Sequence, residues 1–315
     1  MKIIMNEFDY IDKYFRPLTN KFALNLKNDA AIYNHNSSFD LIISTDTLAE
    51  GIHFFGDEDP ANIAKKSLRV NLSDMAAMGA KPIFYNLSLS IPKNKARQFI
   101  PKFAKGLKED QETFDIKLIG GDLTSSLNHI NITITIFGET LNGKSVHRNG
   151  AKIGDCLYVS GILGLSKIGL DNYKSNFNEF QEAKRRYLLP QPRVDLGISL
   201  KNIANSMIDI SDGLVQDATH LAKNSKLTVE LNLCKIPLPN FKQLNKKLIL
   251  NSALYGGDDY ELLFSCNTLN ESLVEELSTK MNLKLTKIGV FKKFKKEYLE
   301  FKNNNSKPKS SYLHF

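Results

Sequence analysis

Acidic side chains stand where segments of this sequence begin or end, and this placement is its most informative chemical feature. The set comprises Asp29, Asp46, Asp74, Asp122, Asp209, Asp212 and Asp258. Hard cations bind carboxylate oxygens, and Mg²⁺ prefers a few carboxylates together with waters and substrate phosphates. Carboxylates gathered from several segments therefore predict a metal–phosphate site. For each residue taken alone, the alternative is a helix cap or a turn, where aspartate is common.

Asp74 has the position that a cap or a turn explains least well. It lies 11 residues after Ile63 on a predicted helix, so at about 100° per residue it returns to nearly the same apolar face. A buried ionised carboxylate costs several kcal/mol unless a cation or a strong partner neutralises it. We expect a metal or site role for Asp74, with a buried structural salt bridge as the alternative. Asn71 and Ser73 beside it could orient the ligands.

Two acidic segments with paired glycines each adjoin a predicted strand, Gly120-Gly121-Asp122 and Gly256-Gly257-Asp258-Asp259. Glycine lets backbone N–H groups approach a phosphate closely, although a tight turn alone explains either segment. No Walker-type or dinucleotide-binding glycine motif is present. The six histidines form no zinc-binding pattern, and His53 is the one near an acidic cluster.

The elements that position these residues begin with a strand over 40–46, whose buried run ends in the polar Ser44-Thr45-Asp46. Asp59 and Pro60 predict the start of a helix over 61–78, which Gly79 ends. Strands follow over 83–91, 116–119 and 130–137, with a helix over 95–112 that Pro101 must kink or restart. This half predicts a mixed α/β or α+β fold.

A break at Asn149-Gly150 predicts a domain boundary, with domains over residues 1–149 and 150–315. A length of 315 residues is consistent with two domains of about 150 residues each. Strands are predicted over 156–160, 207–210, 227–231 and 261–266 in the second half. A helix over 214–223 is predicted there too, capped by Ser211 or Asp212.

Composition narrows the class of protein. Hydrophobic residues make up 42% and charged residues 24% of the chain, which is typical of a globular protein. No apolar run reaches the roughly 18 residues of a membrane span, and the N-terminus lacks the apolar block of a signal peptide. Three distant cysteines predict neither a disulfide framework nor a CxxC metal pair, so we expect a cytoplasmic protein.

The net charge of +8 invites a nucleic-acid interpretation. Much of the excess lies in the lysine-rich stretch over residues 292–309, which we do not identify as the aromatic-interleaved signature of a nucleic-acid-binding segment. A solvated lysine-rich surface is the better interpretation, and we expect no nucleic-acid partner and no membrane.

Several longer motifs occur in a fixed order: Ser44-Thr45-Asp46-Thr47-Leu48, Glu50-Gly51-Ile52-His53-Phe54, Asn71-Leu72-Ser73-Asp74, Gly120-Gly121-Asp122, Arg148-Asn149-Gly150, Asp209-Ile210-Ser211-Asp212-Gly213 and Gly256-Gly257-Asp258-Asp259. In this order they resemble the thiamine-monophosphate kinase family over nearly the whole chain. The Asn-Leu-Ser-Asp and Ser-Asp-Gly-Leu segments are shared with the wider superfamily of aminoimidazole ribonucleotide synthetase, and the segment around His53 narrows the resemblance to the kinase.

The resemblance implies a two-domain fold of the aminoimidazole ribonucleotide synthetase type, with the N-terminal sheet forming a homodimer and the C-terminal α/β domain closing the cleft. It implies ATP as co-substrate and several Mg²⁺ ions. Implied metal ligands are Asp29, Ser44, Thr45, Asp46, Asp74, Asp122, Asp209 and Asp212. Implied nucleotide contacts are Gly121, Asp122, Arg148 and Ser211, and implied contacts with thiamine phosphate are His53, Asp258 and Tyr312. Of these, Asp46, Asp74, Asp122, Arg148 and Asp209 are the expected catalytic residues.

Three positions depart from the family pattern. Lys27-Asn28-Asp29 stands where the family has Gly-Asp-Asp, which leaves the number of metal ions open. Asp258 replaces a glutamate and Ser311 replaces a glycine, and both replacements concern the binding of the substrate.

The expected activity is ATP-dependent phosphorylation of thiamine phosphate to thiamine diphosphate by direct in-line transfer. Alternatives are an aminoimidazole ribonucleotide synthetase, a selenophosphate synthetase, although no cysteine precedes Asp46 to match its reactive one, and a basic nucleic-acid-binding protein.

Overall fold

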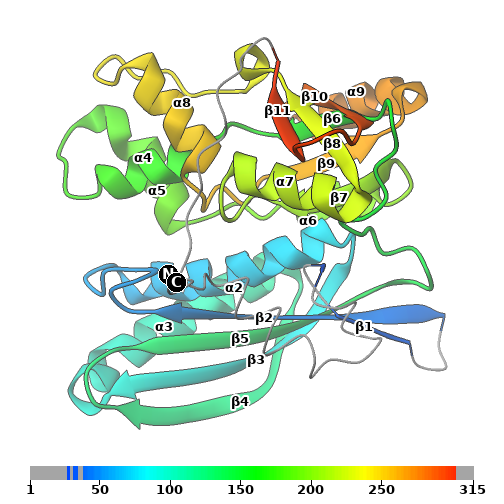
Figure 1. The fold of residues 1–315 in the computed structure, drawn as a ribbon. Helices are drawn as coiled ribbons and strands as arrows, with labels where there is room; N and C mark the ends of the chain where they lie inside the picture. Colours follow the sequence, from blue (N-terminus) through cyan, green and yellow to red (C-terminus); the bar gives the residue numbers. More distant parts are fainter. Residues whose placement is uncertain (1–26, 29–30, 35–37, 303–315) are drawn as a thin grey trace, which may run out of the picture.

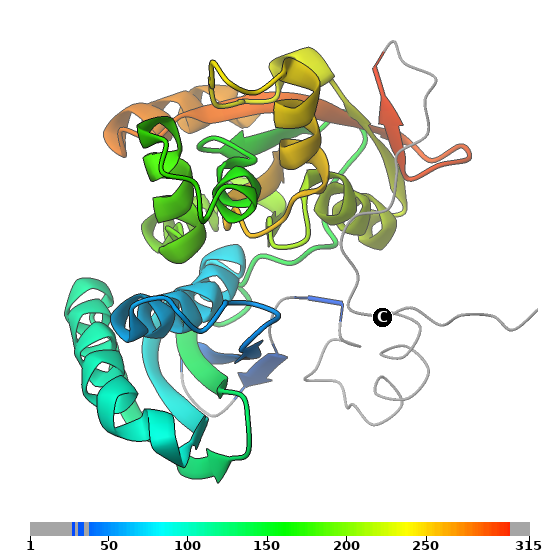
Figure 2. The ribbon, with the colours of Figure 1, turned by 90° about the vertical axis from the view of Figure 1, so that its left-hand side faces the viewer.

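The computed structural model describes residues 27–28, 31–34 and 38–302. Two of the predicted site residues, Asp29 and Tyr312, lie outside this described part of the chain. Two β-sheets are stacked one above the other, and the helix α2 (Pro60–Ala77) lies between them in both views (Figures 1 and 2).

The first sheet contains β1 (Ala31–Asn34), β2 (Phe39–Ala49), β3 (Lys81–Pro92), β4 (Lys117–Ser126) and β5 (Asn131–Leu141), in the order β1-β2-β5-β3-β4. Its neighbours pair antiparallel except β3 and β4, which are parallel. Period-two alternation explains β5, whose Ile132, Ile134 and Ile136 are fully buried in the core. The helices α2 and α3 (Lys93–Phe114) contact the sheet from this buried side.

The predicted start of α2 is confirmed. Asp59 is the N-cap, its side chain accepts a hydrogen bond of 3.0 Å from the backbone N–H of Ala61, and Pro60 is the first helical residue. The helix α3 does not restart at Pro101 but continues through it. Phe99, Phe103 and Leu107 are buried in the core on either side of the proline, and their packing offsets the lost backbone hydrogen bond.

The segment Gly120-Gly121-Asp122 is not the turn that the sequence suggested. It lies inside β4, in register with Asn86, Leu87 and Ser88 of β3. A Cβ on Gly121, whose φ is +153°, would lie 1.8 Å from the carbonyl oxygen of Leu87, so glycine is required by close approach of the two strands.

The second sheet contains β6 (Cys156–Ser160), β7 (Ala204–Asp209), β8 (Leu227–Leu231), β9 (Leu262–Cys266), β10 (Leu285–Lys293) and β11 (Leu299–Phe301), in the order β11-β8-β10-β6-β9-β7. Its helices are α4 (Leu165–Asp171), α5 (Gln181–Leu188), α6 (Val194–Leu200), α7 (Leu214–Ser225), α8 (Lys246–Tyr255) and α9 (Glu271–Lys280). Short 3-10 turns occur at Asn178–Phe180, Leu233–Lys235 and Thr268–Asn270.

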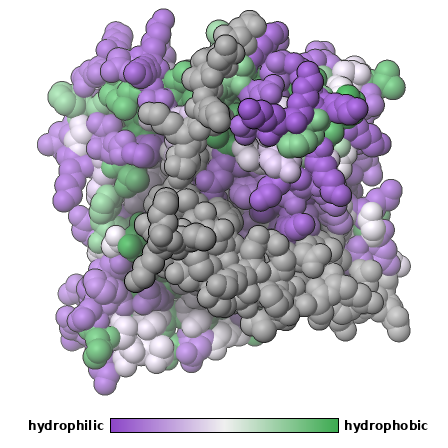
Figure 3. Space-filling view, in the orientation of Figure 1, coloured by the Kyte–Doolittle hydropathy of each residue, from purple (hydrophilic) through white to green (hydrophobic). Residues whose placement is uncertain are grey.

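The predicted boundary at Asn149-Gly150 falls in the segment that joins the two sheets, between β5 and β6. One hydrophobic cluster nevertheless spans both layers, since Met75 and Ala76 of α2 belong to the same core as Met207 and Phe264. Hydrophilic residues predominate on the face of the second layer that Figure 3 shows. None of the described helices combines the length and the apolar character that crossing a membrane requires.

Candidate active site

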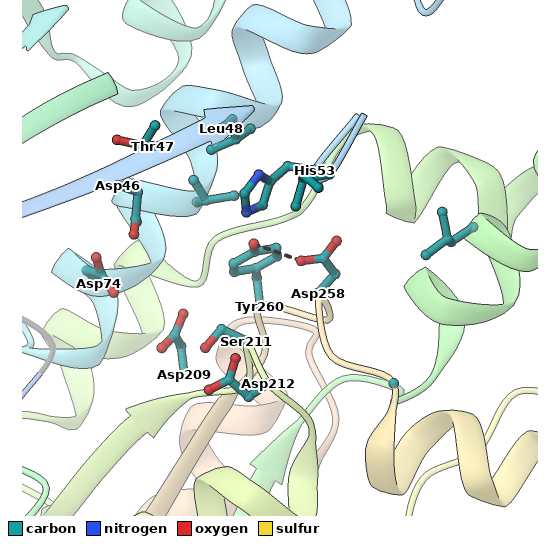
Figure 4. Close-up of a pocket in the computed structure, with 14 residues that line it drawn as sticks. Asp46, Thr47, Leu48, His53, Asp74, Asp209, Ser211, Asp212, Asp258 and Tyr260 are labelled. Carbon is teal, nitrogen blue, oxygen red and sulfur yellow. Dashed lines mark hydrogen bonds between the residues drawn. The ribbon is translucent and has the colours of Figure 1, made fainter. Parts of the chain in front are cut away.

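A cavity of about 330 Å³ lies where α2 faces the second sheet, and half of the predicted site residues line it (Figure 4). Its lining consists of Asp46, Thr47, Leu48, Ile52, His53, Val70, Asp74, Leu170, Asp209, Ser211, Asp212, Gly256, Asp258 and Tyr260. We call Asp46, Asp74, Asp209 and Asp212 the carboxylate end, and His53, Asp258 and Tyr260 the His53 end.

The helix α2 holds two carboxylates of the cavity through adjacent residues. The hydroxyl of Ser73 donates a buried hydrogen bond of 2.6 Å to Asp209 of β7. The next residue, Asp74, accepts a hydrogen bond of 2.5 Å from the hydroxyl of Ser44 in β2. One turn of α2 therefore fixes carboxylates from both layers. Asp74, on the apolar face of α2, has the hydroxyl of Ser44 as a polar partner.

The strand β2 presents consecutive residues to opposite faces of its sheet. The backbone N–H of Asp46 donates to the side chain of Asn71 at 3.1 Å, which ties this strand to α2. The hydroxyl of Thr45 points to the other face, where it donates to Thr135 at 2.9 Å. Of the three predicted ligands in this strand, the structure brings Asp46 to the cavity lining, places Ser44 against Asp74, and directs Thr45 away.

The loop before α7 differs from the predicted cap. The N-cap is Gly213, with φ +114°, and neither Ser211 nor Asp212 caps the helix. Asp217 instead accepts hydrogen bonds from the backbone N–H groups of Asp212 at 3.2 Å and Gly213 at 3.1 Å. Burial raises the pKa of Asp217 well above its ordinary value, and the nearby charges of Asp212 and Asp209 add to this effect.

Arg148 lies outside the cavity lining but close to its carboxylate end. Its positive charge opposes the raised pKa of Asp217. It also adds to the burial that lowers the pKa of His220 in α7 to about 4. The backbone N–H of Arg148 donates to the side chain of Asn28 at 3.0 Å. The residue therefore sits at the junction of the two layers, near the carboxylate end of the cavity.

At the His53 end, one loop of each layer is held by a hydrogen bond within that loop. The imidazole Nδ1 of His53 accepts from the backbone N–H of Ala49 at 3.0 Å, so the proton of the neutral ring is on Nε2. The phenol of Tyr260 donates to Asp258 Oδ1 at 3.0 Å (Figure 4). Burial together with the Asp258 charge raises the pKa of Tyr260 well above its ordinary value, so the phenol keeps its proton.

The segment Gly256-Gly257-Asp258 runs beside the loop that carries Ser211. The N–H of Asp258 donates to the carbonyl of Ser211 at 2.8 Å. A Cβ on Gly257, whose φ is +69°, would lie 2.5 Å from that same carbonyl oxygen. Glycine here allows the close approach that joins the two ends of the cavity.

Gly121 and Asp122 do not reach this cavity within one chain. Asp122 is aligned in register with Ser88, Thr133 and then Thr47 across the first sheet. Three strand spacings of about 4.8 Å separate β4 from β2, which makes roughly 14 Å. The structure thus places Asp122, exposed on the edge strand, apart from the other predicted ligands.

Comparison with known proteins shows the family of the chain. Residues 27–140 match the model of the AIR synthase related protein, N-terminal domain. The chain is 37% identical to the thiamine-monophosphate kinase of Buchnera aphidicola subsp. Schizaphis graminum, over 98% of this chain and 99% of the relative. It is 36% identical to the Escherichia coli K12 thiamine-monophosphate kinase, over 90% of this chain and 89% of that one. The chain belongs to the thiamine-monophosphate kinase family.

Solved structures agree with this assignment. The structure of AaThiL complexed with AMPPCP and TMP superimposes with a TM-score of 0.87 and 31% identity, covering 98% of this chain and 97% of that one. The thiamine-monophosphate kinase from Stenotrophomonas maltophilia K279a gives a TM-score of 0.81 at 31% identity, covering 95% and 98%. HypE from Escherichia coli, with a TM-score of 0.71 at 17% identity, shares the fold. The mixed α/β fold and the kinase class predicted from the sequence are thereby confirmed.

Three residues in or beside the His53 end were not predicted from the sequence: Tyr260, which belongs to it, and Lys66 and Tyr187, which adjoin it. Lys66 extends from α2 to Asp258, and Tyr187 of α5 packs against its ammonium group. A signal for Lys66 was available, since it lies three residues after Ile63 and four before Val70, on the same apolar stripe as Asp74. Tyr187 and Tyr260 carried no comparable signal.

The donors of the carboxylate end fit Mg²⁺ better than a metal held by protein alone. Within residues 27–28, 31–34 and 38–302, no three His, Cys, Asp or Glu side chains are close enough together to hold a metal ion. Mg²⁺ is usually held by one or two carboxylates, with waters and substrate phosphates completing its octahedron. Asp46, Asp74, Asp209 and Asp212 supply hard oxygen donors of that kind.

Proposed function

We propose that this kinase phosphorylates thiamine phosphate with ATP and produces thiamine diphosphate. The observation that carries the proposal is the division of one cavity into a carboxylate end and a His53 end, which suits a polyphosphate at one end and an organic acceptor at the other. The solved relative AaThiL, complexed with AMPPCP and TMP, supports the same pairing of ligands.

Mg²⁺ belongs to this proposal, with Asp46, Asp74, Asp209 and Asp212 as the residues that would hold it. When bound, the metal would neutralise charge on the phosphates of ATP and of the acceptor. Ser44 and Ser73 hold Asp74 and Asp209 in place for that role, because each donates a short hydrogen bond to its carboxylate.

The transfer needs little acid–base chemistry from the chain. The acceptor is already a phosphate oxyanion, so no side chain has to remove a proton before attack. Catalysis then consists of in-line positioning and charge stabilisation, to which Arg148 contributes a planar guanidinium. His53, with its proton on Nε2, can donate a hydrogen bond to the acceptor.

Direct transfer, without a phosphorylated enzyme, is part of the same proposal. A covalent route would need a nucleophile with an adjacent base. Ser44 and Ser73 already donate to carboxylates that are proposed to bind metal, which leaves them poorly placed as nucleophiles. Rapid-quench experiments with γ-labelled ATP, with and without acceptor, should give no labelled protein at catalytically competent rates.

We also propose a homodimer in which the first sheets meet. The face opposite α2 and α3 carries Thr45, Thr47 and Asp122, and nearly all residues of the edge strand β4 are exposed. A second copy on this face would bury these residues and carry Asp122 toward the partner's cavity. Mixing the inactive variants Asp74→Asn and Asp122→Asn should then restore part of the activity, whereas a site within one chain would give no recovery.

A cytoplasmic location completes the proposal. Cys156, Cys234 and Cys266 are all free thiols in the structure, as expected in a reducing compartment.

The deciding experiment is product identification. Pure protein is incubated with ATP, Mg²⁺ and thiamine phosphate, and the products are separated and identified by mass. Thiamine diphosphate and ADP in equal amounts are expected, with no product after chelation by EDTA. Turnover of ATP with another acceptor, and none with thiamine phosphate, would overturn the proposal.

A further inference from the structure

Lys66 is a buried cation at the boundary between the two layers. It lies on α2 and is only 4% exposed. Its ammonium group donates to Asp258 Oδ2 at 3.2 Å and to the backbone carbonyl of His53 at 3.1 Å. The same group lies 3.9 Å from the ring centroid of Tyr187. Three groups therefore contact the charge, and the two hydrogen bonds go to the two residues proposed to contact the acceptor.

Asp258 is held from both sides while it still faces the cavity. Tyr260 donates to Oδ1 and Lys66 to Oδ2. The backbone of Asp258 has φ +57° and that of Tyr260 φ +51°, an unusual conformation for residues other than glycine. The side chain of Asp258 nevertheless remains 37% exposed. The strained backbone costs stability, and both carboxylate oxygens are held by hydrogen bonds. Together these features indicate that the orientation of Asp258 serves a function.

Lys66 also fixes the distance between the loops of the two layers. The carbonyl of His53 accepts from Lys66 and, at 3.4 Å, from the phenol of Tyr187. His53 follows β2 in the first layer, and Asp258 precedes β9 in the second. A single ammonium group therefore connects both walls of the His53 end.

We infer that Lys66 is a positioning residue that sets the acceptor site by holding Asp258 and the His53 segment together. The inference rests on the proposed function, because it assigns the His53 end to the acceptor. Lys66 is too deeply buried to be a group that ligands reach first, and it acts through the two residues it binds. A preorganised site loses less entropy when its ligand binds, so losing Lys66 weakens acceptor binding and spares ATP.

The pairing with Lys66 also indicates what Asp258 recognises. A carboxylate whose charge an ammonium already balances keeps its capacity to accept hydrogen bonds but attracts a further cation weakly. Asp258 is therefore suited to an N–H donor, such as the amino group on the pyrimidine of thiamine phosphate, rather than to the positive thiazolium ring.

The test compares Lys66→Met with Lys65→Met. Lys65 is the preceding residue on α2 and pairs with Glu109 outside the cavity, so its variant controls for loss of a lysine and of an ion pair on the same helix. Lys66→Met should raise the KM for thiamine phosphate by about tenfold or more, because a hydrogen bond to a charged group is lost. The KM for ATP should stay within about twofold in both variants.

A double-mutant cycle shows whether Lys66 acts through Asp258. If it does, Lys66→Met and Asp258→Asn together should raise the KM for thiamine phosphate much less than the product of the two single effects. Independent effects that multiply would contradict the inference.

Other outcomes are equally decisive. An unchanged KM for thiamine phosphate in Lys66→Met, or equal increases in both KM values, would leave only a structural bridge between the layers and would overturn the inference. If circular dichroism shows that Lys66→Met does not fold, Lys66→Arg decides, since it keeps the charge and changes the geometry; it too should raise the KM for thiamine phosphate alone. A wild-type protein that does not phosphorylate thiamine phosphate would refute the proposed function instead.

Discussion

Four aspartates gather at the carboxylate end of the cavity, whereas at the His53 end a single aspartate is paired with a buried lysine. The first arrangement concentrates negative charge, and Asp209 and Asp212 contribute to raising the pKa of their neighbour Asp217. The second arrangement balances its charge with Lys66 and surrounds it with the rings of Tyr187 and Tyr260. Under the proposed function, the carboxylate end would need cations to bind phosphates, whereas the His53 end is already organised by hydrogen bonds in the structure.

Changing a carboxylate at the carboxylate end should have the largest effect. Asp74→Asn nearly preserves volume but removes a charge that a metal needs, so we expect kcat to fall by about 10³-fold or more with the fold intact. Steady-state kinetics and thermal melting measure the two quantities.

Asp171→Asn is the matched control, because Asp171 pairs with Lys167 outside the cavity and its variant should retain normal kcat. Full activity of Asp74→Asn at ordinary Mg²⁺ would remove Asp74 from the metal site. Gross unfolding would favour the buried structural role that the sequence left open.

A smaller loss of activity is expected for a change at Arg148, the positively charged residue near the carboxylate end. Arg148→Lys keeps the charge but replaces a planar fork that can hold two phosphate oxygens by a point charge. We expect kcat/KM for ATP to fall by about tenfold while the KM for thiamine phosphate changes little. Unchanged kinetics for ATP would separate Arg148 from the nucleotide, and an equal loss for both substrates would assign it to the junction of the layers.

The two ends also differ in how well the sequence predicted them. The carboxylate end could be predicted from single segments. Asp46 and Asp209 follow the apolar runs of predicted strands, and Asp74 lies on an apolar helix face, where an ionised side chain requires a partner or a function. Lys66 obeys the same rule on the same helix and could have been found in the same way. Tyr187 could not, because its place beside Lys66 depends on how α5 packs against α2.

The fold shows the same limit. The helix α2 and the strand β6 were predicted nearly to the residue, since a proline-marked start and a short apolar run carry the information locally. The strand β10 was not predicted, because its lysine-rich sequence lacks a regular alternation of apolar and polar residues. Its strand conformation depends on pairing with β6 and β8. Segment Gly120-Gly121-Asp122 looked like a turn because glycines favour turns, whereas a neighbouring strand required them.

Removing a hydroxyl that holds a carboxylate should have a milder effect than removing the carboxylate itself. Ser73→Ala deletes the donor to Asp209, and we expect kcat to fall by about fivefold because one buried hydrogen bond is lost. Ser67→Ala is the control on the same helix, since Ser67 is equally buried and donates only to the carbonyl of Ala64. Equal losses in both variants would show that α2 tolerates no such change, and would remove Ser73 from its positioning role.

The smallest effect on turnover is expected beside the His53 end, where Asp258 and Asp259 are neighbours with opposite environments. Asp258 is paired with Lys66, whereas Asp259 is buried and accepts from the backbone N–H of Gly164 at 2.7 Å. Burial raises the pKa of Asp259 from 3.8 to about 8. The folded protein therefore keeps this proton up to about pH 8, while the unfolded chain releases it near pH 4, so stability should fall as pH rises through that window.

Asp259→Asn removes this dependence: between about pH 5 and pH 8 its free energy of unfolding should decrease by roughly 2–4 kcal/mol less than that of the wild type. Urea titrations at several pH values measure this difference, with Asp171→Asn expected to follow the wild type. Parallel curves for wild type and Asp259→Asn would mean that Asp259 is ionised in the folded kinase and would contradict this prediction.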